Sequence, residues 1–115
     1  MTATASPSDD RQRLITALAG VPRDLAARMV CLLAIGAVEV VRDDYSQWPQ
    51  VERIIFNATM LLFCKSWLED DDLAEVINYG IQIDDLVHFT DDPIRFAAIT
   101  DDVRARALRI FLGGD

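Results

Sequence analysis

The 115-residue chain lacks the motifs that mark several large classes of protein. It has one His and two Cys with no CxxC pair, so no zinc-binding motif is present. Its five Gly form neither a GxGxxG fingerprint nor a P-loop, and no Ser stands in a GxSxG motif. The sequence therefore gives no support for a zinc protein, a nucleotide-binding fold or a triad hydrolase, and we expect no cofactor and no bound metal.

Long hydrophobic runs are also missing. The longest unbroken apolar stretch, residues 29–38, is about half the length of a bilayer-spanning helix. The N-terminus has neither the basic nor the apolar region of a secretory signal. Cys31 and Cys64 lie in apolar stretches, where we expect buried, unpaired thiols. These features predict a cytoplasmic protein that contacts no membrane.

Helix start and stop signals dominate what is present. Asp, Ser or Thr precede most of the apolar segments, Pro stands near several starts, and no strand-like alternation occurs between turn residues. The pattern predicts an all-α, compact single-domain bundle of five or six helices. We assign residues 1–8 to a disordered N-terminal tail and residues 9–115 to the helical domain. Within it, residues 22–42 and 49–68 are expected to form the central antiparallel pair.

Four residues are predicted to mark the beginning or the end of a helix. Ser8 and Thr100 are predicted N-caps, because their hydroxyls can accept an unpaired backbone N–H. Gly20 and Gly80 are predicted stops, because Gly adopts the left-handed conformation that ends many helices.

Negative charge is concentrated in one segment. Residues 69–92 carry nine carboxylates and no Lys or Arg, a formal charge of −9, whereas the whole chain carries −8. Helix capping accounts for many Asp positions, and a docking surface for a basic protein is the functional interpretation. The predicted acidic partner-binding residues are Glu69, Asp70, Asp71, Asp72, Glu75, Asp84, Asp85, Asp91 and Asp92.

A second candidate surface follows one apolar stripe. Phe56, Met60, Phe63 and Trp67 recur at four-three-four spacing, opposite the face expected to enter the core. The central run, residues 29–41, is likewise apolar nearly all round. Two fully enclosed helices strain the surface-to-volume ratio of a chain this short. Either both helices are central, or the stripe binds another chain, most simply in a homodimer.

Three functions remain open. The favoured one is a small non-enzymatic interaction module, in concrete form a bacterial immunity or antitoxin-type inhibitor that covers the basic cleft of a toxin such as a nuclease. The bias toward Arg over Lys and Asp over Glu favours a GC-rich bacterial genome. The second is a homodimeric helical adaptor or secretion chaperone that uses the apolar stripe. The third is a metal-dependent enzyme using Asp84, Asp85 and His88, which could share a helical face.

Nucleic-acid binding is not expected. The spacing of small and apolar residues in residues 72–89 roughly resembles that of a helix-turn-helix, but the recognition helix would carry Asp84 and Asp85 toward the phosphates.

Overall fold

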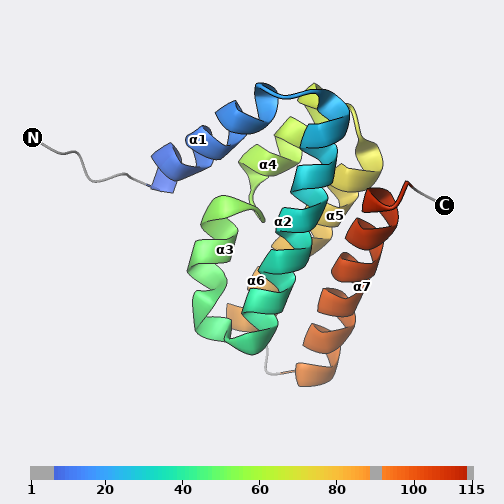
Figure 1. The fold of residues 1–115 in the computed structure, drawn as a ribbon. Helices are drawn as coiled ribbons and strands as arrows, with labels where there is room; N and C mark the ends of the chain where they lie inside the picture. The colour runs from blue at the N-terminus through green and yellow to red at the C-terminus, as the bar shows by residue number, and fades with distance from the viewer. Residues whose placement is uncertain (1–6, 89–91, 114–115) are drawn as a thin grey trace, which may run out of the picture.

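Two long helices run the length of the protein and pack in opposite directions (Figure 1). The first, α2 (Arg23–Asp43), begins after Pro22, whose φ of −54° already suits a helix. The second, α7 (Pro93–Phe111), begins after Asp92, whose carboxylate accepts a backbone N–H of the first turn at 3.0 Å. Residues 49–68 were predicted as the main antiparallel partner of α2. That prediction is wrong, because α7 makes the more extensive contact.

The computed structural model describes residues 7–88 and 92–113, and every regular element in these ranges is helical, which confirms the predicted all-α bundle. None of the helices in these ranges is long and apolar enough to cross a membrane. The other elements, in chain order, are α1 (Pro7–Ala19), the 3-10 turn η1 (Tyr45–Gln47), α3 (Trp48–Ile54), α4 (Ala58–Leu62), the π-helical segment η2 (Phe63–Trp67), α5 (Asp71–Ile81) and α6 (Ile83–His88).

The predicted N-terminal tail, residues 1–8, overlaps with α1. Pro7 and Ser8 already belong to that helix, so Ser8 is not its N-cap. Residues 1–6 lie outside the described part of the chain. Gly20 does follow the last residue of α1, as predicted.

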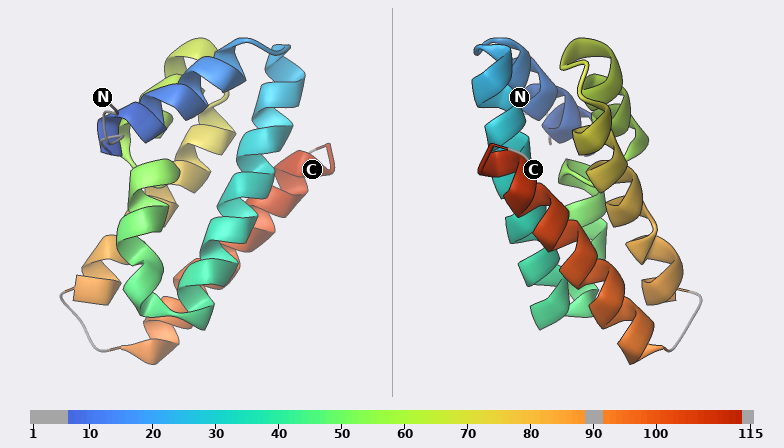
Figure 2. Two further views of the ribbon diagram at one scale, coloured as in Figure 1. Left: turned by 60° about the vertical axis from the view of Figure 1, so that its left-hand side comes forward. Right: turned by 90° about the vertical axis from the view of Figure 1, so that its right-hand side faces the viewer.

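The helices enclose the core from several sides. α2 lies along one side of the molecule, α5 and α6 lie along the opposite side, and α7 crosses between them (Figure 2). The smallest principal extent is 20 Å, the thickness of about two layers of helices. In such a thin arrangement the side of α2 that faces away from α5 stays uncovered by the other described helices, and its residues are exposed.

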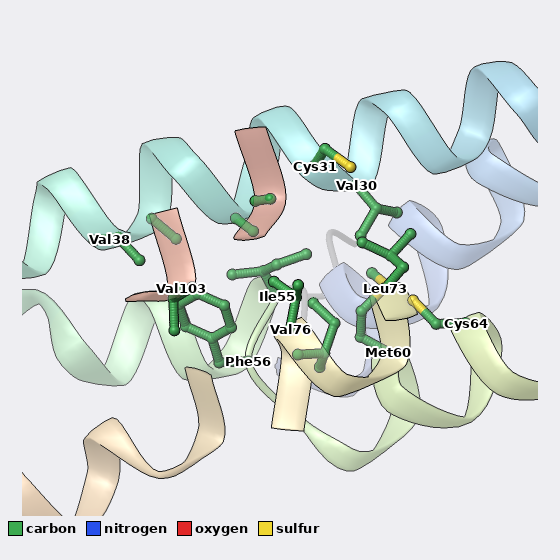
Figure 3. Close-up of a cluster of buried hydrophobic side chains, with 14 of the residues drawn as sticks. Val30, Cys31, Val38, Ile55, Phe56, Met60, Cys64, Leu73, Val76 and Val103 are labelled. Atoms are coloured by element: carbon green, nitrogen blue, oxygen red, sulfur yellow. The ribbon is translucent and has the colours of Figure 1, made fainter. Parts of the chain in front are cut away.

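The two cysteines lie in this core. Cys31 and Cys64 are both fully buried and unpaired, which confirms the prediction (Figure 3). Burial, together with the negative charge of Asp70, raises the pKa of the Cys31 thiol to about 11 and that of Cys64 to about 12. Both thiols are therefore protonated at neutral pH and behave as small apolar side chains.

The helix predicted over residues 49–68 is broken near its middle. Asn57 accounts for the break, because its side chain serves the helices on both sides. Its amide nitrogen donates to the Glu52 carbonyl at 2.8 Å, near the end of α3. Its amide oxygen accepts the backbone N–H of Met60 at 2.8 Å, at the start of α4. The chain changes direction here, and Phe56 is carried into the core.

Gly80 was predicted to end a helix, and α5 ends one residue later, at Ile81, although Gly80 itself is helical. A Cβ at this position would lie 2.2 Å from the ring of Phe56. The residue is therefore required by close packing against the aromatic ring rather than by a left-handed backbone.

Thr100 was predicted to begin the last helix, but α7 is continuous through it. The Thr100 side chain is fully buried, and its hydroxyl donates to the Phe96 carbonyl one turn earlier at 2.9 Å. The hydroxyl therefore has its hydrogen-bond partner inside the helix and does not cap the start of a new one.

Candidate functional site

The acidic segment is divided between the two ends of α5. Residues 69–75 lie at its N-terminal end, whereas Asp84 and Asp85 follow its C-terminal end in α6 and Asp92 precedes α7 (Figure 1). α5 has 11 residues and a length of about 16 Å, and it separates the two groups. That distance exceeds the screening length of about 8 Å at physiological ionic strength. The structure therefore forms two separate acidic groups, and Asp91 lies outside the described residues.

The group at the C-terminal end serves the fold. Asp84 is half-buried and accepts the indole N–H of Trp48 at 2.7 Å, which ties α6 to α3. The carboxylate of Asp92 caps α7, while Asp85 is exposed in the first turn of α6.

The group at the C-terminal end of α5 includes two of the three residues predicted to bind a metal. Among the described residues, no three His, Cys, Asp or Glu side chains lie close enough to hold a metal ion. The side chain of His88 lies outside the described residues, so the metal-dependent alternative with Asp84 and Asp85 stays a prediction.

The group at the N-terminal end of α5 is more exposed. Asp70 is its structural member, because its carboxylate caps α5 by accepting the Leu73 backbone N–H at 3.0 Å. Asp71, Asp72 and Glu75 are exposed around the first two turns of the helix. The free N–H groups and positive dipole of this helix end suit carboxylates, which explains the local acidity physically.

Two arginines from other helices approach this group and lower its net charge. A guanidinium nitrogen of Arg23 lies 3.8 Å from a Glu69 oxygen, and one of Arg106 lies 4.0 Å from a Glu75 oxygen. Both pairs are exposed, so each contributes little to stability. Neither pair is visible in the local sequence, because the partners are far apart along the chain.

The segment that leads into this group has an unusual backbone. The π-helical hydrogen bond from the Leu68 N–H to the Phe63 carbonyl measures 3.1 Å. Glu69 then adopts a left-handed φ of 52°, which is uncommon for a residue with a side chain. Single-turn π-helices and left-handed non-glycine residues are both found preferentially at functional sites.

Two apolar side chains of this segment are exposed to solvent. Leu62 is 62% exposed and Trp67 is 45% exposed. Because π-helical hydrogen bonds join residues five apart, the two side chains lie about one turn from each other. The guanidinium of Arg23 lies 5.7 Å from the Trp67 ring centroid and covers part of it. We name this surface, formed by Leu62, Trp67, Glu69, Asp71, Asp72 and Glu75, the α4–α5 corner.

The predicted apolar stripe is not a surface. Phe56, Met60 and Phe63 are buried in the core, and only Trp67 of the four is exposed. The partner-surface interpretation is therefore wrong for these three residues. The break at Asn57 is the physical reason, because the stripe does not follow one straight helix and its first residues turn beneath α5.

A groove continues from the corner between α4 and α5. Its volume is about 430 Å³, and it combines apolar and charged walls. The lining residues are Leu61, Lys65, Asp71, Ala74, Glu75 and Asn78. The corner and the groove together offer an aromatic side chain, carboxylates and a recess, which are components found in binding surfaces.

No protein-family model matches the chain, and the searches of curated proteins and of solved structures find no match either.

Proposed function

We propose that this protein is a small, non-enzymatic interaction module that binds a basic protein through the α4–α5 corner. The observation that carries the proposal is the exposed ring of Trp67 at a turn with an unusual backbone. Arg23 contacts both this ring and Glu69, and three further exposed carboxylates follow in the first two turns of α5. Interfaces draw most of their affinity from a few aromatic or Arg side chains, and charged rims steer association. The corner has both components.

An immunity or antitoxin-type inhibitor is the concrete form of this proposal. A toxin that cleaves nucleic acid has a basic cleft, and carboxylates can occupy the positions of phosphates there. The carboxylates of Asp71 and Asp72 are adjacent and exposed, which supports a role of this kind. The proposed compartment is the bacterial cytoplasm, and the two unpaired thiols are consistent with a reducing environment.

The decisive experiment separates local from total charge. The partner is first captured from the native host with the wild-type protein and identified. Its association rate is then measured with Asp71→Lys/Asp72→Lys and with the matched control Glu52→Lys/Asp85→Lys, which changes the net charge equally at exposed sites elsewhere. We expect the corner variant to slow association by roughly tenfold or more at low salt, and the control to have little effect.

Trp67→Ala tests the aromatic part of the corner. It should accelerate dissociation of the captured partner by about thirtyfold, corresponding to the 2 kcal/mol that defines an interface hot spot. A partner that responds to neither the corner variant nor Trp67→Ala would contradict the proposal. Thermal unfolding of each variant confirms that the fold is retained, since Lys in the first turn of α5 costs only about 0.3–1 kcal/mol per residue.

A further inference from the structure

α2 exposes a continuous apolar face on the side that no other described helix covers (Figure 1). Leu25 is 46% exposed, Leu32 is 53% exposed and Val40 is 45% exposed. With 3.6 residues per turn, these three side chains share one face with Met29 and Gly36. We name this surface, formed by Leu25, Met29, Leu32, Gly36 and Val40, the outer face of α2.

The outer face continues into an apolar groove between α2 and α3. The groove has a volume of about 330 Å³, and its walls are almost entirely apolar. Its lining residues are Leu32, Leu33, Gly36, Ala37, Val40, Gln50, Val51, Ile54 and Ile55. An apolar helix face that continues into an apolar groove can accept a second helix.

Gly36 gives the first indication of what covers this face. A Gly inside a helix costs about 1 kcal/mol relative to Ala. Within the protein nothing requires it, because a Cβ at this position would meet no atom within 4 Å. A helix of another molecule that crosses close to the α2 backbone would require it, since Gly is used where backbones approach closely.

The charges beside the outer face indicate that the other molecule is a second copy. Along one flank of α2 stand Asp24, Arg28, Glu39 and Arg42, with alternating signs. If two copies of α2 pack antiparallel about a two-fold axis near residue 33, Asp24 lies opposite Arg42 of the second copy. Arg28 then lies opposite Glu39 of the second copy, and both pairs occur twice. In a parallel pairing this flank would face the other flank of the second copy, so neither of these opposite-charge pairs would form.

These flanking residues also have contacts within one molecule. Glu39 pairs with Arg104 and Arg42 pairs with Asp101, both on α7. The Glu39 side chain is still 52% exposed and can bind a second guanidinium. Arg28 is exposed as well, although its guanidinium lies over the ring of Phe111. The charges therefore remain available at the surface while α7 holds them in position.

We propose that the protein forms a homodimer through the outer face of α2. The two helices cross antiparallel near residue 33, and the Leu32 side chain of each copy packs into the space left by Gly36 of the other. This surface is separate from the α4–α5 corner, so the proposal goes beyond the proposed function and can fail independently of it.

The molar mass in solution is the first test, measured by sedimentation equilibrium over a range of protein concentrations. The wild type should have about twice the mass of one chain, and Gly36→Leu should have the mass of one chain while keeping its helical circular dichroism. Leu108→Arg is the control, because Leu108 on α7 is 46% exposed, the same fraction as Leu25 on the outer face of α2. It should remain dimeric. A wild type that stays monomeric overturns the proposal, and a different protein bound to this face then becomes the occupant to test.

Disulfide cross-linking is the second test, and it fixes the direction of the helices. Leu32 lies close to the two-fold axis, so Leu32→Cys should cross-link with itself under mild oxidation. Leu25 lies about eight residues from the axis, which places the two copies of this position about 25 Å apart along the helices. Leu25→Cys should therefore not cross-link, since a disulfide needs Cα atoms within about 7 Å. Cross-linking by both variants indicates a parallel dimer and contradicts the antiparallel arrangement.

Discussion

At the scale of single residues, the glycine with the least room for a side chain among those described is Gly80, which lies against Phe56. A methyl group at Gly80 would lie 2.2 Å from the ring, whereas one at Gly20 would lie 3.6 Å from its nearest neighbours. Because the Phe56 ring is fully buried, it has little room to move.

We therefore expect Gly80→Ala to lower the free energy of unfolding by about 1–3 kcal/mol. Gly20→Ala, the control, should change it by less than about 1 kcal/mol. Urea unfolding monitored by circular dichroism measures both effects. Equal stabilities for the two variants would show that the contact between Gly80 and Phe56 is relaxed in solution.

The two buried thiols predict a loss of stability at alkaline pH. Their pKa values in the folded protein, about 11 for Cys31 and about 12 for Cys64, lie above the unfolded value of 9.0. Because the folded pKa values are raised, this contribution to stability is fully present below pH 9. It is lost as the pH rises through the folded values, with a slope of up to about 1.4 kcal/mol per pH unit for each thiol.

The comparison is between the wild type and Cys31→Ala/Cys64→Ala, unfolded in urea from pH 7 to pH 11. The two proteins share every other titratable group, so only the difference between their slopes reports on the thiols. The variant should be less stable at pH 7 because of the cavities it creates, and should lose stability less steeply above pH 9. Parallel pH profiles would contradict the predicted burial of the thiols.

At the scale of helices, the caps divide the carboxylates into structural and exposed members. Asp70 and Asp71 are neighbours at the start of α5, but only the Asp70 carboxylate is the cap. Asp70→Ala should therefore destabilise the protein by about 1 kcal/mol, while Asp70→Asn should cost much less, because Asn caps as well as Asp.

Asp71→Ala is the control for this comparison, and it should cost only a few tenths of a kcal/mol from the weakened dipole interaction. Midpoints of thermal unfolding at pH 7 rank the three variants. If Asp71→Ala were as damaging as Asp70→Ala, the cap assignment would be wrong.

The accuracy of prediction from sequence also varies from helix to helix. The start of α7 agrees with a local signal, because the Asp92 cap acts within one turn. Gly20 follows the end of α1 as predicted, but without the left-handed backbone on which that prediction rested. Gly80 and Thr100 carry the same signals, yet tertiary packing gives them other roles. Gly80 packs against the ring of Phe56, 24 residues earlier in the chain. The Thr100 hydroxyl donates a hydrogen bond to the Phe96 carbonyl in the same helix. Neither relation has a local pattern in the sequence.

The candidate site was only partly predictable for the same reason. The carboxylates at residues 69–75 were found from composition, but their pairing with Arg23 and Arg106 depends on how distant helices pack. Trp67 was found as a member of a stripe, although the backbone that exposes it differs from the straight helix expected. The outer face of α2 was missed because its all-round apolar pattern was interpreted as full enclosure.

At the scale of the whole molecule, the thinness of the fold connects the two surfaces. With 115 residues in about two layers of helices, α2 can be covered on one side by the core but not on the other. A second copy would complete that coverage and leave the α4–α5 corner of each copy available. A dimer would then present two acidic corners to its partner.

A mixing experiment tests this arrangement through its charges. Arg28→Glu places a Glu opposite Glu39 of the second copy, and Glu39→Arg places an Arg opposite Arg28 of the second copy. At low salt, where this repulsion is strongest, each variant alone should therefore dissociate at protein concentrations at which the wild type stays dimeric. In an equimolar mixture each copy of one variant can pair with a copy of the other. Both opposed pairs are then again of opposite sign, and dimers should reappear. Sedimentation of the two variants, separately and mixed, measures this recovery. Because screened charges lose their effect, recovery should fade as the salt concentration rises. If the mixture sediments as the separate variants do, Arg28 and Glu39 do not pair across the dimer, and the antiparallel arrangement is contradicted.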